Sequence, residues 1–116
     1  MTTRNTLVIH VFAEDAAVLT AALRVARNAV DDLSPDGIVQ LVVQGGAVRG
    51  LVADGAYRDD LVATIRSAGV QVLACQNSMS REDVDADSLL EGVSTVAAAV
   101  GYLARQQWAG AAYVRL

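Results

Sequence analysis

The chain has 116 residues, which is the usual length of one domain, so the sequence predicts a single domain over residues 1–116. Hydrophobic residues make up 53% of the chain and charged residues only 19%. A body this small has much surface for its volume, and this composition supplies few polar side chains to cover it. The composition therefore predicts a homo-oligomer, because association of copies removes apolar surface from water.

The sequence argues against nucleic acid and against a membrane as partners. Thirteen acidic and nine basic residues give a net charge of −4, and the basic residues, all arginines, are scattered. Nucleic acid is therefore not an expected partner, since no basic stripe is present to neutralise phosphates. The N-terminal segment Met1–Asp15 lacks the apolar core of a signal peptide, and no segment approaches the ~18 apolar residues of a membrane span. With a single cysteine no internal disulfide can form, and the sequence predicts a cytoplasmic protein.

The first half of the chain alternates strand and helix patterns. Leu7–Phe12 is a nearly continuous apolar run rich in β-branched residues, as in a strand buried on both faces. Asp15–Leu33 has helical spacing with one apolar stripe, and Asp15 is its expected cap. Ile38–Val43 repeats the buried-strand pattern and ends in a predicted tight turn at Gln44–Gly46.

The second half continues the alternation. A helix is predicted at Tyr57–Ala68 and a third buried strand at Val70–Ala74, which ends at Cys75. Ser80–Leu90 is acidic and predicts a short capped helix. A brief strand, a charge-poor helix and a closing strand follow, at Val93–Val96, Ala97–Gln107 and Ala112–Leu116.

This alternation with short connections predicts an α/β domain with three layers (α/β/α). Its sheet should have about five strands, mainly parallel, in a flavodoxin-like outline, with right-handed crossovers between strands. The three buried runs should lie at the centre of the sheet. In such sheets ligands bind outside the carboxyl ends of the strands, where Cys75 is expected.

Cys75 is the candidate catalytic residue. A thiol that faces a helix N-terminus has its thiolate stabilised by free backbone N–H groups, which suits a nucleophile or a sulfur carrier. A carrier's side chain is expected to be partly exposed or to line a pocket, with Asn77 and Ser78 as supporting polar contacts. In the alternative interpretation Cys75 packs as a small hydrophobic residue, and the acidic side chains of 82–87 oppose an anionic sulfur.

His10 is the only histidine, and it falls on the strand face of Val8 and Phe12. A hydrogen-bonded core histidine is the favoured interpretation, and a base or hydrogen-bond partner for Cys75 is the alternative. One cysteine and one histidine fall short of a zinc site, so no metal is expected. The glycines of Gln44–Gly50 lack the lysine and spacing of a P-loop and the three-glycine dinucleotide pattern, so no cofactor is expected either.

Four phrases, taken in order, resemble the DsrE/DsrF-like sulfur-relay family. They are ARNAVDDL (26–33), VVQGGAV (42–48), GVQVLACQNSM (69–79) and GYLARQQWAGAAYVRL (101–116). The third is the most telling, a strand that ends in Cys-x-Asn-(Thr/Ser)-Met. The resemblance implies a small three-layer protein that assembles as a trimer or hexamer. It also implies that the matching cysteine, Cys75, accepts and passes on a persulfide sulfur from a donor to an acceptor protein.

The sequence leaves two hypotheses for the function. The first is a sulfur-relay protein that carries a persulfide on Cys75. The second is a non-catalytic oligomeric module that binds a small ligand or a protein at the strand-end crevice. A hydrolase or oxidoreductase is disfavoured because acid–base pairs and cofactor fingerprints are missing. Whether the chain is an enzyme stays open at this point.

Overall fold

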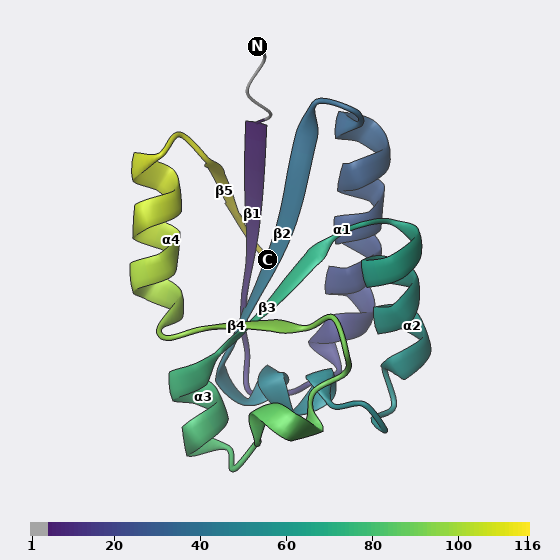
Figure 1. Ribbon diagram of the computed structural model, residues 1–116, viewed down its shortest axis with the longest axis vertical. Helices are drawn as coiled ribbons and strands as arrows, with labels where there is room; N and C mark the ends of the chain where they lie inside the picture. Colours follow the sequence, from purple (N-terminus) through teal and green to yellow (C-terminus); the bar gives the residue numbers. More distant parts are fainter. Residues whose placement is uncertain (1–4) are drawn as a thin grey trace.

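The computed structural model describes residues 5–116. They contain one sheet of five parallel strands (Figure 1). The strands are β1 (Asn5–Phe12), β2 (Gly37–Gln44), β3 (Gln71–Cys75), β4 (Ser94–Val96) and β5 (Ala112–Arg115). Their order across the sheet is β4-β3-β2-β1-β5. The predicted parallel sheet is therefore confirmed, and the three buried runs lie at its centre as β3, β2 and β1.

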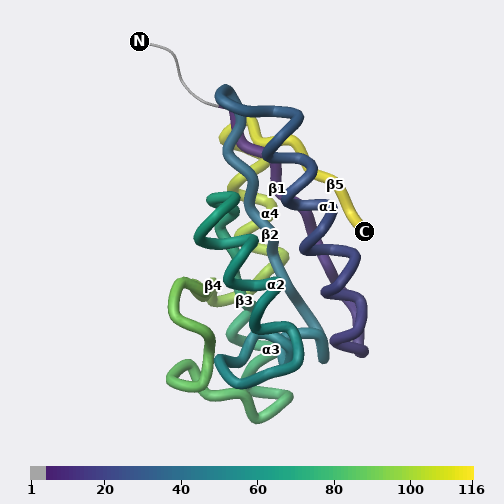
Figure 2. Tube along the Cα trace, turned by 90° about the vertical axis from the view of Figure 1, so that its right-hand side faces the viewer, coloured from purple at the N-terminus to yellow at the C-terminus, as the bar shows by residue number. Residues whose placement is uncertain are grey.

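Helices cover both faces of the sheet. They are α1 (Val18–Leu33), α2 (Arg58–Val62) with a π-helical turn η2 (Ala63–Ser67), α3 (Gln76–Arg81) and α4 (Ala99–Trp108). Two 3₁₀ segments, η1 (Gly45–Leu51) and η3 (Ala86–Ser88), lie in connections. Figures 1 and 2 show α1 and α2 on one face and α4 alone on the other, with α3 beyond the carboxyl end of β3. The predicted three layers are thus confirmed.

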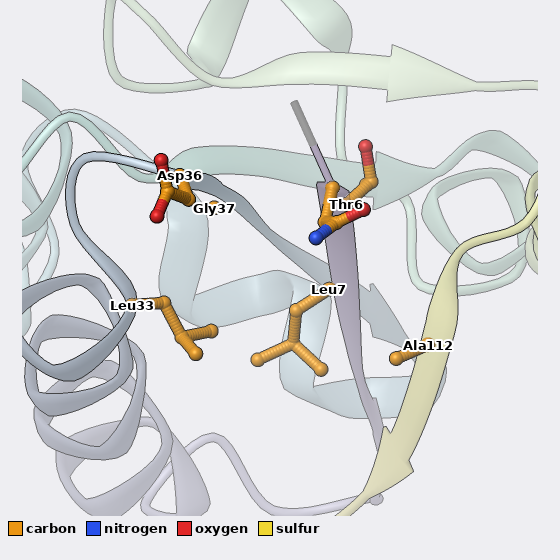
Figure 3. Close-up of a pocket in the computed structure, with 7 residues that line it drawn as sticks. Thr6, Leu7, Leu33, Asp36, Gly37 and Ala112 are labelled. Carbon is orange, nitrogen blue, oxygen red and sulfur yellow. The ribbon is translucent and has the colours of Figure 1, made fainter. Parts of the chain in front are cut away.

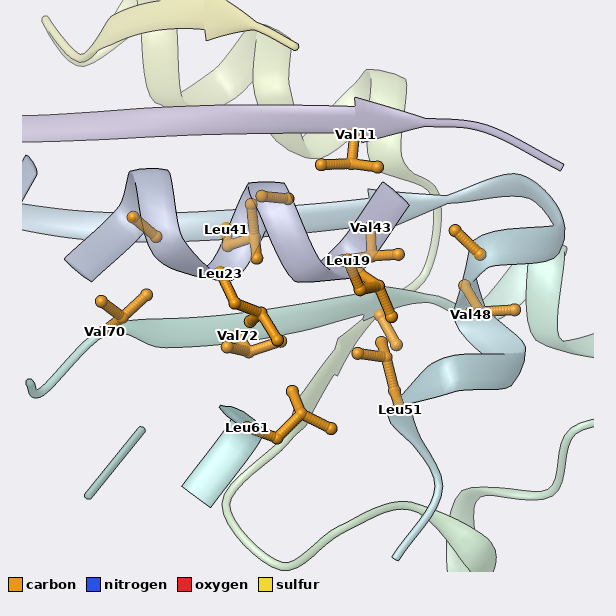
Figure 4. Close-up of a cluster of buried hydrophobic side chains, with 14 of the residues drawn as sticks. Val11, Leu19, Leu23, Leu41, Val43, Val48, Leu51, Leu61, Val70 and Val72 are labelled. Carbon is orange, nitrogen blue, oxygen red and sulfur yellow. The ribbon is translucent and has the colours of Figure 1, made fainter. Parts of the chain in front are cut away.

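The main core lies between the sheet and the α1–α2 layer (Figure 4). Alternate strand residues point into this layer because side chains alternate across a strand. Leu19 and Leu23 of α1 and Leu61 of α2 meet them there and are fully buried. This core buries the strand residues Ile9, Val11, Val39, Leu41, Val43, Val72 and Ala74, together with Val70 just before β3.

A smaller core lies on the opposite face, under α4. It contains Leu103 and Ala99 of α4 and the strand residues Val8, Val42, Leu73 and Cys75. A single helix cannot cover this whole face. Phe12 and Tyr113, which face the same side by the strand register, remain 46% and 38% exposed.

Three local predictions were wrong. The predicted helix at Ser80–Leu90 is not formed: α3 begins directly after Cys75 and ends at Arg81, and Asp83 just beyond it adopts a φ of 55°. Asp15 is not the N-cap residue of α1, which is Ala17; its carboxylate instead accepts from the N–H of Ala17 in the turn that leads into the helix. The glycines after β2 form the 3₁₀ segment η1 rather than a tight turn.

No helix within residues 5–116 has the length and apolar character required to cross a bilayer.

Candidate functional site

Cys75 is the last residue of β3 and the residue that caps α3. The chain changes from extended to helical at this point, so the first N–H groups of α3 have no partner inside the helix. Cys75 pairs in register with Val96 of the edge strand β4. The structure therefore has Cys75 at the carboxyl edge of the sheet, as expected from the sequence.

Ser78 lies one turn further along α3 and is 4% exposed. Its Oγ accepts a hydrogen bond of 2.8 Å from the backbone N–H of Gly45. Because the oxygen is occupied as an acceptor, the hydroxyl hydrogen is left to donate toward Cys75. The start of η1 thus orients the hydroxyl beside the thiol.

Burial raises the pKa of the Cys75 thiol, and hydrogen bonds lower it by more. These bonds come from the backbone N–H and the hydroxyl of Ser78 and from the backbone N–H groups of Ala99 and Asn77. The pKa of Cys75 consequently lies below its ordinary value. Donors that stabilise the thiolate overcome the cost of desolvating it, which is the pattern of a reactive cysteine.

The supporting residues differ in how they contribute. Asn77 donates through its backbone, and its side chain is exposed. Glu82, one of the acidic residues expected to oppose an anionic sulfur, forms an ion pair with Arg49. This pair, between η1 and the residue after α3, partly neutralises the charge of Glu82.

Both ring nitrogens of His10 form hydrogen bonds with residues other than Cys75. Its Nε2 donates to Oε1 of Gln44 at 2.9 Å, and its Nδ1 lies 2.7 Å from the hydroxyl of Tyr113. The residue is 6% exposed. The sequence alone does not identify Gln44 and Tyr113 as partners of His10, because these contacts depend on the parallel pairing of β1 with β2 and β5.

Cys75 itself is only 2% exposed, so the expectation of a partly exposed side chain is wrong for the single chain. The smaller core under α4 covers it, with Ala99 at the start of that helix and Leu103 one turn on. A reagent can reach the sulfur only when this cover moves.

A cavity of about 380 Å³ lies far from Cys75, at the amino end of the sheet (Figure 3). Leu7 and Leu33 point into it, and Thr6 and Asp36 lie at its rim. Ligands of parallel sheets gather at the opposite end, so this cavity is not the candidate site. Over residues 5–116 no three His, Cys, Asp or Glu side chains are grouped to hold a metal ion.

Solved structures of three proteins share this architecture. MTH1491 from Methanobacterium thermoautotrophicum, a protein of unknown function, is 31% identical with a TM-score of 0.84 over 97% of this chain and 99% of that chain. The ychN protein from E. coli is 14% identical with a TM-score of 0.72, over 98% and 100% of the two chains. BT1422 from Bacteroides thetaiotaomicron, a conserved protein of unknown function, is 17% identical with a TM-score of 0.71, over 97% and 95%.

No protein-family model matches the chain, and no curated protein matches its sequence. The two more distant structures establish the fold alone. The identity to MTH1491 extends over nearly the whole of both chains. The chain therefore belongs to the family of MTH1491, whose members have the DsrE/DsrF-like fold.

Proposed function

We propose that the protein is a sulfur carrier that holds a persulfide on Cys75. The observation that supports this most is the set of hydrogen bonds around the thiol. They lower its pKa although the residue is buried. A cysteine that served only as packing would have no need of polar groups that favour its thiolate.

The chemical step is an exchange of sulfur between thiols. The Cys75 thiolate attacks the outer sulfur of a donor persulfide, R–S–SH, and a new sulfur–sulfur bond forms on Cys75. The bond inside the donor breaks, and R–S⁻ leaves with the electron pair. Ser78 and the N–H groups of Asn77 and Ala99 stabilise the thiolate before attack, and in this proposal they also stabilise the persulfide anion afterwards.

Access to Cys75 requires local opening at the β4–α4 junction. β4 has three residues, pairs with β3 on one side only, and leads directly to the first turn of α4. Short edge elements open more readily than central strands. In this proposal the β4–α4 junction opens, either spontaneously or on contact with the donor protein. When the junction closes again, it shields the sulfur carried by Cys75.

The test is persulfide loading of the intact chain. The purified protein is incubated with glutathione persulfide and weighed by mass spectrometry. We expect an adduct of about 32 Da, the mass of one sulfur atom, which dithiothreitol removes. Cys75→Ser is the control, and because the chain has one cysteine any adduct on that variant would contradict the proposal.

The second candidate is a binding module without sulfur chemistry, which the 2% exposure of Cys75 favours. In that case Cys75 stays unmodified by the donor and resists a small alkylating reagent until the protein unfolds. Alkylation of the folded chain thus separates the two functions.

We also propose that copies of the chain assemble into a closed homo-oligomer, a trimer or hexamer. Trp108 and Val100 of α4 are 83% and 67% exposed, and burying such large apolar side chains favours association. The Val43–Leu51 region contributes little to this surface because most of it is buried inside the chain.

A further inference from the structure

Gln44, the last residue of β2, lies next to Cys75 on the same face of the sheet. The register of β2 and β3 pairs Val43 with Ala74. One further step along both strands places Gln44 beside Cys75. Gln44 faces α4 because it follows Val42 by two residues, and Val42 packs in the smaller core with Cys75. Neighbouring strands are about 5 Å apart, so the Gln44 side chain can reach an atom bonded to Cys75.

The orientation of the Gln44 amide is set by two hydrogen bonds in series. Its Oε1 lies 2.9 Å from Nε2 of His10, and because a carbonyl oxygen only accepts, this Nε2 carries the hydrogen. In the neutral imidazole Nδ1 is then the acceptor, and the Tyr113 hydroxyl, at 2.7 Å, donates to it. Both hydrogens therefore point from Tyr113 toward Gln44.

The amide nitrogen of Gln44 is the unused end of this series. Oε1 and Nε2 stand on opposite sides of Cδ, so an oxygen held by β1 turns the nitrogen away from β1, the side on which Cys75 lies. Among residues 5–116 this nitrogen has no hydrogen-bond partner, and it is not a buried unsatisfied atom, so it contacts solvent. Gln44 is half-buried, between Phe12 at 46% exposure and Cys75 at 2%. It therefore has two hydrogens to donate at the border between solvent and the thiol.

A persulfide on Cys75 needs a donor at this place. In the exchange, the Cys75 thiolate bonds to the outer sulfur of R–S–SH and the bond inside the donor breaks. The proton passes to the leaving sulfur, which gives R–SH and the anion Cys75–S–S⁻. The donors from Ser78, Asn77 and Ala99 lie at Sγ of Cys75, whereas most of the charge lies on the outer sulfur, about 2 Å further. A hydrogen bond to this charged atom would be stronger than one to a neutral acceptor.

Two charged groups at this end of the sheet are engaged elsewhere. The Arg115 guanidinium carbon lies 5.9 Å from the ring centre of Phe12, and Glu82 pairs with Arg49. The neutral amide of Gln44 thus remains as a side-chain donor for the outer sulfur.

We propose that Gln44 is a substrate-binding residue whose Nε2 donates a hydrogen bond to the outer sulfur of a persulfide on Cys75. This inference rests on the proposed sulfur-carrier function. His10 and Tyr113 are positioning residues, because they hold Oε1 of Gln44 and so turn its amide. In a purely structural role, Gln44 would only satisfy the Nε2–H of His10.

The test is a pH titration of the loaded protein. The chain is loaded with glutathione persulfide, and the near-ultraviolet absorbance of the persulfide anion is followed to give the pKa of the outer sulfur. Gln44→Met removes the donor and should raise this pKa by about one pH unit, the usual effect of a hydrogen bond to a charged group. The pKa of the unloaded Cys75 thiol, measured by alkylation, should move much less. Gln40→Met is the control on the same strand and face: its amide bonds Gln71 and Tyr102, and both pKa values should stay unchanged.

Gln44→Glu keeps an acceptor for the Nε2–H of His10 and loses only the donor. The pKa of the persulfide should again rise by more than the pKa of the thiol. Equal rises of the two pKa values would come from added charge or from a shift of the structure, and they would overturn the inference. A wild-type chain that takes up no sulfur would reject the proposed function and this inference with it. A loaded chain whose persulfide pKa is the same in the wild type and in both Gln44 variants would reject the role of Gln44 alone.

The direction of the hydrogen bonds can be measured in the wild-type protein. His10 is the only histidine, so the nitrogen NMR signals of its ring report the tautomer directly. We expect a hydrogen on Nε2 and none on Nδ1. The opposite tautomer would require the Gln44 amide nitrogen to face His10 and its oxygen to face Cys75. That oxygen would repel an anionic sulfur, and the inference would be overturned.

Discussion

Gly45 and Ser78, which are 33 positions apart, are joined by a hydrogen bond of 2.8 Å from the backbone of one to the hydroxyl of the other. The bond ties the start of η1 to α3 directly beside Cys75. It has two consequences. It fixes the serine hydroxyl as one of the donors that lower the pKa of Cys75, and it satisfies a buried N–H group at a glycine with positive φ.

The first prediction is that Ser78→Ala raises the pKa of Cys75. The variant loses the hydroxyl that donates to Cys75, together with the bond from Gly45 that orients this hydroxyl. Less thiolate is therefore present at neutral pH. The pH profile of alkylation by iodoacetamide measures this, and its midpoint should move upward from the wild-type value. Ser80→Ala is the matched control, because Ser80 is on the same helix but exposed. Equal midpoints in the two variants would contradict the role of Ser78.

The second prediction concerns the backbone of Gly45. Its φ is 82°, and an added Cβ would lie 2.8 Å from the carbonyl oxygen of Ala13. Gly69 has a similar φ of 76° with nothing within 4 Å of such a Cβ. Gly69→Ala should therefore cost about 1–2 kcal/mol of unfolding free energy from the left-handed conformation alone.

Gly45→Ala should cost more than Gly69→Ala, because crowding adds to the same conformational strain. Urea unfolding of the two variants gives the comparison. A smaller loss at Gly45 would mean that η1 shifts to make room. In that case the alkylation profile of Cys75 should also move, because Ser78 would lose its donor.

Much of the fold could be predicted from the sequence because its signals are local. Continuous apolar runs such as Leu7–Phe12 are typical of central parallel strands, and the helical stripe of α1 is equally plain. The position of Cys75 at a strand end followed from the same patterns. These features depend on neighbouring residues alone.

The contacts of the site could not be predicted in the same way. The Gly45–Ser78 bond and the pairing of Tyr113 with His10 join distant segments, and they depend on strand order and register. The burial of Cys75 under Ala99 depends on where α4 docks. The capping residues after Ser80 suggest a helix, but α3 starts at Gln76 and ends at Arg81, before most of the acidic segment.

The third prediction tests assembly. We expect sedimentation at micromolar concentration to give a trimer or hexamer. Trp108→Asp and Val100→Asp should shift it toward smaller species, because each puts a charge on an apolar surface that association would bury. Arg66→Asp, on the exposed η2 turn of the opposite face, is the control and should sediment like the wild type. A wild-type monomer would refute the proposed oligomer.

The last prediction concerns how a reagent reaches Cys75. Ala99 is the first residue of α4, is 1% exposed and packs in the same small core as the thiol. Ala99→Gly removes a buried methyl group worth about 0.8 kcal/mol, which should raise the population of the open form and the alkylation rate of Cys75 about fourfold. Ala104→Gly removes a methyl group five residues further along α4, away from Cys75, and should have a much smaller effect. The rates are compared at one pH well above the wild-type midpoint, where the thiolate fraction is constant. Equal acceleration by both variants would indicate that the whole helix must detach before Cys75 reacts, and the proposed opening at the β4–α4 junction would then be wrong.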